Sequence, residues 1–276
     1  MKVALIIATI HRKAELECLL ASLLGQTYRE FMVILADQNP VGFLVPLLAK
    51  FKKKLNIKHL YVPANGVSNA RNAGIEAMPD DAQLIAFPDD DCFYEPDTLE
   101  QAVNYLRTYS ECSGILGQWQ VPGASYFAFS PQKINRYSAF RRGETYTFFF
   151  RLTPAVKALH YDPLIGPGTG LPWGCGEDTD YLLRFMEVAE YAVFRVADVH
   201  VRHPASNVDC AYEKIYAYAA GRMYLLRKHD YPLWFQIFTV VYPLLRMPLD
   251  GRKKFKYRWN MFWGRLVSFW QKNRNN

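Results

Sequence analysis

The chain has 276 residues, half of them hydrophobic and 21% charged, which is enough to bury a sizeable core in one large domain or in one domain with an appendage. Its five cysteines are irregularly spaced and include no C-x-x-C pair. This argues against a disulfide framework or a zinc site and for reduced thiols in a cytosolic compartment. Residues 206–276 carry thirteen Lys or Arg and four acids, a net of +9 against +7 for the whole chain, which indicates an anionic partner such as a membrane or a nucleic acid.

Apolar runs alternate with helical patterns along the first hundred residues. Strands are expected at residues 2–10, 31–36, 57–62 and 84–87, and helices at 14–24, 45–54, 67–78 and 97–109. The first run is read as a strand and not as a signal peptide, because no small-residue cleavage site follows it. Strands that alternate with helices predict βαβ units and a mainly parallel sheet. No G-x-G-x-x-G follows the first strand, so a dinucleotide fingerprint is absent.

The pattern is weaker in the second half of the chain. Further strands are expected within residues 115–128, interrupted by Pro122 and Gly123, and then a helix at 181–188 and a strand at 192–201. Residues 136–151 mix basic and aromatic side chains and receive no assignment. The glycine-rich segment 166–170 is either an acceptor lid, because glycine permits large backbone changes, or a plain connector.

Three consecutive carboxylates, Asp89, Asp90 and Asp91, leave the carboxyl end of the strand at 84–87. Side chains two residues apart on an extended segment point the same way, so Asp89 and Asp91 can face one cation together. Carboxylate oxygens suit Mg²⁺ or Mn²⁺, and strand carboxyl ends are where open α/β sheets bind ligands. The alternative is a solvated acidic turn that caps the following helix.

A possible phosphate site lies at the start of the helix at 67–78. Arg71 and Asn72 are placed there, and a guanidinium together with backbone N–H groups favours a phosphate or a nearby carboxylate. The alternative for Arg71 is an ion pair with the acids at 89–91, which does not exclude the first role.

Four sequence motifs follow one another along the chain, and their order is informative. Residues 8–12 read Ala-Thr-Ile-His-Arg, 66–74 read Gly-Val-Ser-Asn-Ala-Arg-Asn-Ala-Gly, 89–91 are followed by Pro96, and 176–180 read Gly-Glu-Asp-Thr-Asp. They resemble the Pro-Thr-Tyr-Asn-Arg, G-x-S-x-A-R-N-x-G, D-x-D and G-E-D-x-D motifs of family 2 glycosyltransferases, over most of residues 2–205. The resemblance implies the GT-A fold, a Rossmann-like, mostly parallel sheet flanked by helices. It also implies a nucleotide-sugar half at about 1–100 and an acceptor half at about 101–205. Residues 206–276 lie beyond the resemblance and are expected to form a basic helical extension.

The resemblance also implies roles for single residues. Asp37 takes the place of the acid that contacts uracil, although Gln38 and Asn39 depart from the family pattern there. Asp91, with Asp89 beside it, would hold the metal ion, and the family's Val-x-His-Pro stretch favours His203 over His200 as a further ligand. The remaining donor-binding residues implied are Thr9, Arg12, Arg71, Asn72, Asp89 and Asp90.

A base must take the proton from the acceptor hydroxyl. By resemblance to inverting members of the family, that base is Asp178, and neighbouring carboxylates with partial burial would raise its pKa. The alternative for the acidic trio is helix capping, which suits Thr179 or Asp180 better than Asp178. Glu177 is expected on the acceptor side. Trp173 is expected either to stack on an acceptor sugar or to be an ordinary buried Trp.

The basic C-terminal region is expected to dock on a membrane. Residues 231–245 are too short, and too interrupted by prolines, to span a bilayer comfortably. Residues 255–270 place aromatic and aliphatic side chains on one helix face, with Lys and Arg elsewhere, as in helices that lie in the headgroup plane. The alternative is a helix packed on the catalytic domain. Nucleic acid is disfavoured because no recognition module is legible.

The sequence therefore predicts a metal-dependent inverting glycosyltransferase on the cytoplasmic face of the cell membrane, with Mn²⁺ or Mg²⁺ as cofactor. It would move a sugar from a nucleotide sugar, UDP-linked by expectation, to a hydroxyl of a lipid-linked glycan or polysaccharide precursor. One alternative is a nucleotidyltransferase, but residues 8–12 lack the glycine-rich loop of that class. The other is a non-catalytic, membrane-docked nucleotide or glycan binding module. The sequence does not name the sugar, the linkage or the oligomeric state.

Overall fold

The computed structural model describes residues 1–204, 212–251 and 254–270. The chain divides into two compact units, one made of Met1–Tyr161 and Tyr181–Ala205 and the other of Asp162–Asp180 and Ser206–Asn276. Their positions relative to one another are not determined. The first unit contains the sheet, and the second is built on three long helices.

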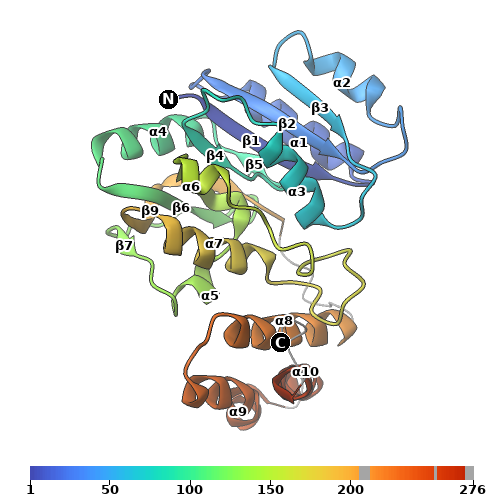
Figure 1. The fold of residues 1–276 in the computed structure, drawn as a ribbon, viewed down its shortest axis with the longest axis vertical. Helices are drawn as coiled ribbons and strands as arrows, with labels where there is room; N and C mark the ends of the chain where they lie inside the picture. The colour runs from blue at the N-terminus through green and yellow to red at the C-terminus, as the bar shows by residue number, and fades with distance from the viewer. Residues whose placement is uncertain (205–211, 252–253, 271–276) are drawn as a thin grey trace. The chain divides into compact units, whose positions relative to one another are not determined.

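One sheet of nine strands, counted over the described residues, organises the first unit (Figure 1). Its order is β3-β2-β1-β4-β8-β6-β9-β5, and β7 also pairs with β9. The strands are β1 Val3–Thr9, β2 Phe31–Asp37, β3 Ile57–Tyr61, β4 Leu84–Ala86, β5 Phe93–Tyr94, β6 Cys112–Gln120, β7 Gln132–Lys133, β8 Phe148–Arg151 and β9 Ala192–Arg202.

The parallel part of the sheet comes from the first half of the chain. β1 pairs with β2 and β4, and β2 pairs with β3, all in parallel, and the long β6–β9 ladder is parallel too. The strands β5, β7 and β8 pair antiparallel with their neighbours. β1 and β2 are buried almost throughout, as parallel strands covered on both faces must be. The βαβ alternation expected from the sequence is confirmed.

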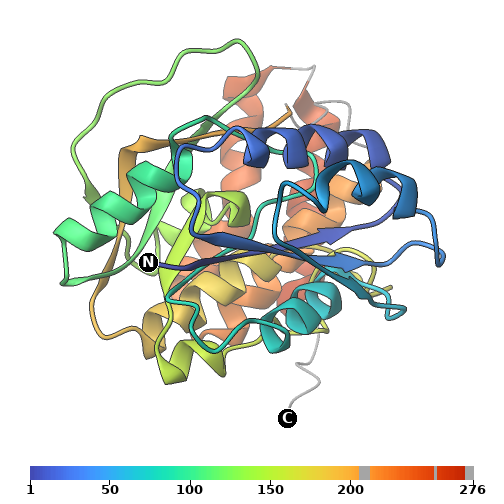
Figure 2. The same ribbon diagram turned by 90° about the horizontal axis from the view of Figure 1, so that it is seen from above.

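Helices cover both faces of this sheet. They are α1 Lys13–Leu24, α2 Val45–Phe51, α3 Val67–Glu76, α4 Thr98–Thr108 and α7 Glu177–Val188, with the short α5 Ala139–Arg142, α6 Pro154–Lys157 and the 3-10 turn η1 Thr145–Thr147. Buried residues of α1, α2 and α4 share one core with alternate residues of β1, β2 and β4. Figure 2 shows α1 and α2 (blue) on one side of the strands and α3 (teal) on the other.

The other face of the sheet accepts α3 because that helix carries a glycine at the contact. A Cβ on Gly74 would lie 2.4 Å from Cγ2 of Ile6, so no larger residue fits without movement. The later turns of α7 cover the same sheet further along. There Phe185 stacks on Phe150 with ring centroids 3.9 Å apart. Successive strand side chains point to opposite faces, so Leu5 and Phe149 belong to the core of the first face while Ile6 and Phe150 are buried on the second.

The second unit contains α8 Tyr212–Lys228, α9 Leu233–Asp250 and α10 Phe255–Trp270. α10 packs on α8 at Gly264, where a Cβ would lie 2.6 Å from the carbonyl oxygen of Tyr216. Ser268 Oγ donates to the carbonyl of Ala220 at 3.0 Å, one turn further along. The buried face of α10 is therefore made of small and polar residues. In the described ranges no helix is both long and apolar enough to cross a membrane.

Two stretches differ from the sequence expectations. Strands were expected through 115–128, but β6 ends at Gln120 and no strand follows before Gln132. The turn at Pro122 and Gly123 leads instead into a loop held by hydrogen bonds to the Gln118 side chain. Residues 136–151, left without assignment, supply α5, η1 and the buried strand β8.

Candidate donor and metal site

The candidate site lies at the carboxyl ends of the parallel strands. Thr9, the last residue of β1, pairs in register with Asp37, the last residue of β2. The acids at 89–91 follow β4, which pairs with β1 on its other side. In an open α/β sheet this edge is the usual ligand site, and the strand order alone brings Thr9, Asp37 and the acids to it.

Asp90 is the buried member of the acidic triplet. Its Oδ2 accepts a hydrogen bond from Thr9 Oγ1 at 2.8 Å, and its Oδ1 lies 3.1 Å from Nη1 of Arg12. Burial raises the pKa of Asp90 to about 6, and repulsion by Asp91 and Asp89 acts in the same direction, against the pull of Thr9 and Arg12. The carboxylate of Asp90 therefore orients Thr9 and Arg12 rather than facing solvent.

Asp89, Asp91 and His203 form the candidate metal centre. Each can offer one ligand atom, and these atoms lie within 4.8 Å of one another. His203 reaches the acids because β5, which begins two residues after Asp91, pairs antiparallel with the end of β9, with Phe93 opposite Arg202. Both metal residues expected from the D-x-D motif and the expected histidine are therefore brought together.

The His203 ring is held from several directions. It stacks on Tyr146 with centroids 4.3 Å apart, and the Trp119 ring meets it edge-on at 6.1 Å. Its Nδ1 lies 2.8 Å from the carbonyl oxygen of Pro204, which can only accept, so Nδ1 carries the proton and Nε2 faces Asp91. Burial alone would lower the pKa of His203, but the Asp91 carboxylate raises it. His200 is not part of this cluster, because its ring stacks on Tyr126 at 3.9 Å.

The residues of this cluster fit a divalent cation. Asp91 Oδ1 is buried and, among the described residues, accepts no hydrogen bond, although it lies 3.2 Å from His203 Nε2. Burial opposes the ionisation of Asp91, yet its contacts with His203 and Arg12 lower its pKa below the ordinary value. Two carboxylates and an imidazole are ligands that Mn²⁺ accepts, and carboxylates alone suit Mg²⁺.

Two arginines neutralise the acids. Arg12 Nη1 lies 2.5 Å from Asp91 Oδ2, and Arg71 Nη2 donates to Asp89 Oδ1 at 2.8 Å. The Arg71 guanidinium also lies over the Tyr161 ring, 5.1 Å from its centroid. The ion pair considered as the alternative for Arg71 is thus present, and the same two cations lie where a diphosphate would come close to the metal ligands.

Two other predicted donor residues are held by the protein itself. The Asn72 amide donates to the carbonyl of Tyr161 at 2.9 Å and accepts from its N–H at 2.7 Å, which fixes the segment that follows β8. Asp37 accepts from the backbone and side chain of Asn39 and lies 2.8 Å from His59 Nε2. Both side chains therefore position neighbouring groups in this structure, and their contacts with a donor remain predictions.

The predicted base and acceptor residues lie in the second unit. Asp178 and Glu177 open α7, in an acidic first turn that also contains Asp180. Asp180 is fully buried and lies 2.7 Å from Lys228 Nζ and 2.9 Å from His229 Nε2, so it takes part in buried ion pairs, and its expected role as a helix cap stays a prediction.

Trp173 has the arrangement of the buried alternative. It is 7% exposed, its ring stacks on Tyr224 with centroids 4.5 Å apart, and its indole N–H donates to the carbonyl of Leu164. The segment 166–170 holds Gly166, Gly168 and Gly170 at positive φ, which other residues rarely adopt.

A comparison with protein families assigns the chain. The family described as glycosyl transferase family 2 matches residues 4–160, more than half of the chain. The chain belongs to this family. The match covers β1 to β8 and therefore includes the D-x-D acids and both arginines, but it ends before Asp178 and His203.

Several solved structures carry the same fold, and a curated relative matches part of the chain in sequence. The succinoglycan biosynthesis protein ExoW of Rhizobium meliloti is 33% identical over 93 residues, which is 33% of this chain and 29% of ExoW. The chain thus spans well under two thirds of that relative. TarS of S. aureus, residues 1–349 with UDP, is 18% identical with a TM-score of 0.60, covering 80% of this chain and 65% of TarS. The mannosyltransferase PcManGT of Pyrobaculum calidifontis, with GDP-Man and Mn²⁺, is 12% identical with a TM-score of 0.62, covering 97% and 73%. These likenesses confirm the GT-A fold.

Several residues of this glycosyltransferase site were not found from its sequence. Tyr146 and Trp119 pack against His203, and His59 pairs with Asp37. Gln26, fully buried just after the end of α1, accepts from Leu99 N and donates to the carbonyl of Glu95, which fixes the turn after the acids. No spacing rule links these residues to the motifs.

Proposed function

We propose that this family 2 chain is a metal-dependent inverting glycosyltransferase that takes its sugar from a nucleotide diphosphate. The cluster of Asp89, Asp91 and His203 beside Arg12 and Arg71 carries the proposal. A leaving nucleotide diphosphate accumulates negative charge, and preorganised cations stabilise it best where burial limits water. Residues 1–205 would form the catalytic domain, with the nucleotide sugar in the half at about 1–100 and the acceptor in the half at about 101–205.

The donor would be held by residues that the protein already orients. Arg12 would exchange Asp91, and Arg71 would exchange Asp89, for phosphate oxygens. Asp90, oriented by Thr9, would keep Arg12 in place. Asp37 and Asn72 would lie near the nucleoside and the diphosphate. TarS has been solved with UDP and with UDP-GlcNAc, and PcManGT with GDP-Man, so both nucleotides belong in the test, and we propose UDP.

The metal ion would be Mn²⁺ or Mg²⁺, held by Asp89, Asp91 and His203. When bound, a divalent ion supplies charge neutralisation at the leaving diphosphate. The imidazole ligand favours Mn²⁺ over Mg²⁺. The role of the chain is to keep His203 Nε2 turned to the acids by stacking it on Tyr146 and fixing its Nδ1 proton on the Pro204 carbonyl.

Asp178 would take the proton from the acceptor hydroxyl. Of the acids in the first turn of α7, Asp180 is fully buried against Lys228 and His229 and is therefore a poor candidate for the base. The acceptor would be a hydroxyl of a lipid-linked glycan or polysaccharide precursor, with Glu177 on the acceptor side. The match to a succinoglycan biosynthesis protein supports a polysaccharide pathway.

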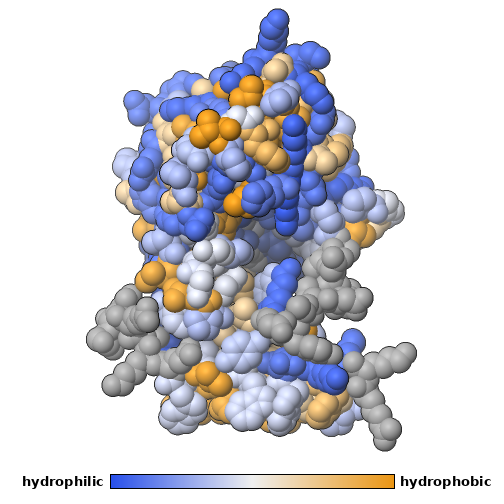
Figure 3. Space-filling model, turned by 90° about the vertical axis from the view of Figure 1, so that its right-hand side faces the viewer, coloured by the Kyte–Doolittle hydropathy of each residue, from blue (hydrophilic) through white to orange (hydrophobic). Residues whose placement is uncertain are grey.

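We also propose that residues 206–276 dock on the cytoplasmic face of the cell membrane. α9 exposes Trp234 at 64% and Leu245 at 58%, together with further large apolar residues of the same face: Leu233, Ile237, Phe238, Val241, Tyr242 and Leu249. α10 exposes Phe255, Trp259, Trp263, Val267 and Trp270. In Figure 3, hydrophobic side chains stand among hydrophilic ones on the molecular surface. Exposed aromatics among Lys and Arg support binding to an anionic lipid surface.

A donor screen tests the function. UDP- and GDP-sugars are incubated with the full chain in Mn²⁺, in Mg²⁺ and in EDTA, and release of the nucleoside diphosphate is measured. We expect release from one donor class with metal and loss in EDTA. Release that is unchanged by EDTA would refute the metal role, and the absence of both release and binding for every donor would refute the function.

A further inference from the structure

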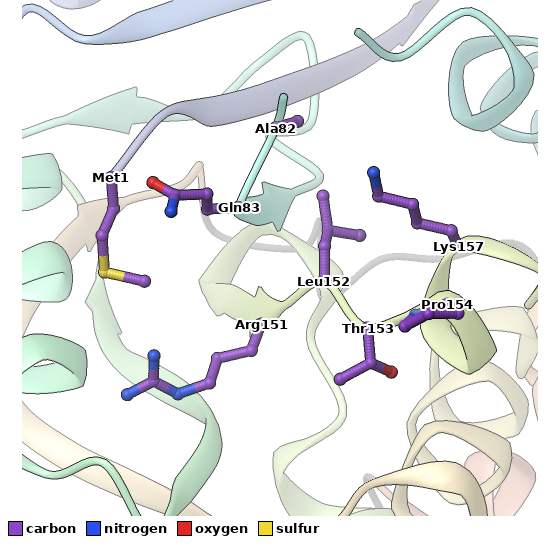
Figure 4. A pocket seen from close by; sticks show the side chains of 8 residues that line it. All are labelled: Met1, Ala82, Gln83, Arg151, Leu152, Thr153, Pro154 and Lys157. Carbon is purple, nitrogen blue, oxygen red and sulfur yellow. The ribbon is translucent and has the colours of Figure 1, made fainter. Parts of the chain in front are cut away.

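Two cavities of the first unit use their cations differently. One, of about 420 Å³, lies at the amino ends of β1 and β4, at the sheet edge opposite the acids, and its lining includes Arg151 and Lys157 (Figure 4). Arg151 donates to the carbonyl of Cys112 and Lys157 to that of Asp80, each at 2.7 Å. Both cations serve backbone groups, so this cavity belongs to the scaffold.

The second cavity, which we call the Arg195 pocket, has a volume of about 260 Å³ and is lined by Leu116, Trp119, Phe127, Arg142, Glu144 and Arg195. Two aromatic side chains and two guanidinium groups thus share a space just below the lower end of the range for drug-sized sites. Aromatic faces and polar groups around a small hollow suit a single sugar ring. The excess of positive charge suits a ring that carries an acidic substituent.

Arg195 is the unusual member of this lining. It is 7% exposed, yet within the described part of the chain its guanidinium makes no hydrogen bond and no ion pair. It lies over the ring of Phe129, 4.2 Å from the centroid, and near that of Phe127 at 5.8 Å. Burial and the proximity of Arg142 lower the pKa of Arg195, and Glu144 opposes them. Glu144 lies near enough to act on this pKa but forms no ion pair with Arg195. A buried cation without a direct anionic partner is costly, which indicates that a ligand supplies one.

The pocket is preformed by side-chain hydrogen bonds. The buried Gln118 amide donates to the carbonyl of Phe127 at 2.9 Å and accepts from its N–H at 3.0 Å, which holds the loop after β6 over the pocket. The same amide nitrogen lies 3.3 Å from the carbonyl of Ala197, where the β6–β9 register shifts. A site organised in this way loses little freedom on binding.

The pocket begins beside the metal cluster and extends away from it. Trp119 lines the pocket and its ring meets the His203 ring edge-on. The backbone N–H of His203 donates to the carbonyl of Gln120. Arg195 pairs with Leu116, which precedes Gln120 by four residues on β6. Arg195 is therefore about 13 Å further along the sheet than the end of β6 that contacts His203. This separation is too long for a phosphate held at the cluster. It suits a group one or two units along an acceptor glycan.

We propose that the Arg195 pocket is an acceptor subsite that binds one sugar ring bearing a carboxylate or a phosphate, with Arg195 and Arg142 on the anion and Trp119 and Phe127 on the ring. This rests on the proposed glycosyltransferase function and adds a substrate class to it. The chain would accordingly prefer acidic glycans as acceptors.

Saturation-transfer NMR tests the subsite without the need to know the acceptor. The probes are methyl β-glucuronide, glucose 6-phosphate and methyl β-glucoside, each added to the full chain with saturating UDP and Mn²⁺ so that the donor site is filled. The variants are Arg195→Gln, Arg195→Lys and Arg142→Gln, and the control is Arg141→Gln, a neighbouring arginine outside the lining. Binding of UDP and Mn²⁺ by every variant reports on the fold.

We expect the wild-type chain and Arg141→Gln to bind at least one acidic probe 10- to 100-fold more tightly than the glucoside. Arg195→Gln and Arg142→Gln should lose that preference, and Arg195→Lys should keep part of it. Whichever acidic probe binds more tightly, the glucuronide or the sugar phosphate, shows whether the subsite prefers a carboxylate or a phosphate. Equal binding of acidic and neutral probes, no binding by the wild-type chain, or an undiminished preference in Arg195→Gln would overturn the subsite. A wild-type chain that fails to bind UDP and Mn²⁺ would instead count against the proposed function.

Discussion

The imidazole of His203 and the carboxylate of Asp91 lie side by side, with Nε2 and Oδ1 3.2 Å apart, although they come from the two separate chain segments that make up the first unit. The contact follows from one short ladder, in which β5 leaves the acids and pairs with the end of β9. The metal centre is thus assembled by strand pairing and not by sequence proximity.

Replacing His203 should weaken metal binding directly. We expect His203→Ala to bind Mn²⁺ at least tenfold more weakly, because one of three ligands is lost, while Mg²⁺ binding falls less. Electron paramagnetic resonance of free Mn²⁺ measures the change. His200→Ala is the matched control, since that ring stacks on Tyr126 and lies outside the cluster. Equal Mn²⁺ affinity in the two variants would remove His203 from the ligand set.

Asp178 and Asp180 should respond in opposite ways to the same change. Asp178→Asn should abolish transfer but leave unfolding and the binding of UDP and Mn²⁺ unchanged. Asp180→Asn should cost roughly 3–5 kcal/mol of stability, because it leaves the cations of Lys228 and His229 without their buried carboxylate. Urea unfolding and donor turnover, measured on both variants, separate the two roles. Transfer that survives in Asp178→Asn would show that another group is the base.

Asp90 should make the metal-free protein less stable at neutral pH than at about pH 4. Its folded-state pKa of about 6 lies above the ordinary value of 3.8, so the folded protein holds this proton more tightly than the unfolded chain does. The destabilisation is therefore absent below about pH 4 and complete above about pH 6. Asp90→Asn should raise stability in EDTA at pH 7 by about 1–3 kcal/mol while reducing donor binding. A stability difference between the two proteins that does not grow from pH 4 to pH 7 would contradict this account.

The sequence predicted those parts of the fold in which one pattern dominates. β1, β2 and the helices that follow them have clear periods, and α10 spans the range expected for a helix, 255–270. The sequence did not predict β5, β7 and β8, because strands of two to four residues are too short to show an alternation of apolar and polar residues. Their pairing also depends on partners that are distant in sequence. The site divides in the same way. Motifs identify Asp89 and Asp91, but only tertiary packing brings Tyr146 onto the His203 ring.

The packing of α10 on α8 should depend on the absence of a side chain at Gly264. We expect Gly264→Val to destabilise the chain by about 1–3 kcal/mol, because the added atoms meet the carbonyl of Tyr216 and the Cβ of Ala219. Thermal unfolding of the full chain measures the loss. Val267→Ala, on the exposed face of α10, is the control and should change stability little. If Gly264→Val unfolds like the wild type, the close contact between the two helices is not required.

Binding to anionic membranes should depend on the exposed apolar face of α9. The double change Trp234→Ser with Phe238→Ser should lower partitioning into phosphatidylglycerol vesicles by more than tenfold, since two large apolar side chains no longer enter the interface. Added salt should weaken binding of the wild-type chain, because Lys and Arg contribute to it. Tyr109→Ser, at an aromatic side chain exposed on the first unit, is the control and should bind like the wild type. Vesicle cosedimentation gives the partition coefficients. Partitioning that is unchanged in the double variant would exclude this face from membrane docking, and light scattering would then test whether it joins two copies of the chain instead.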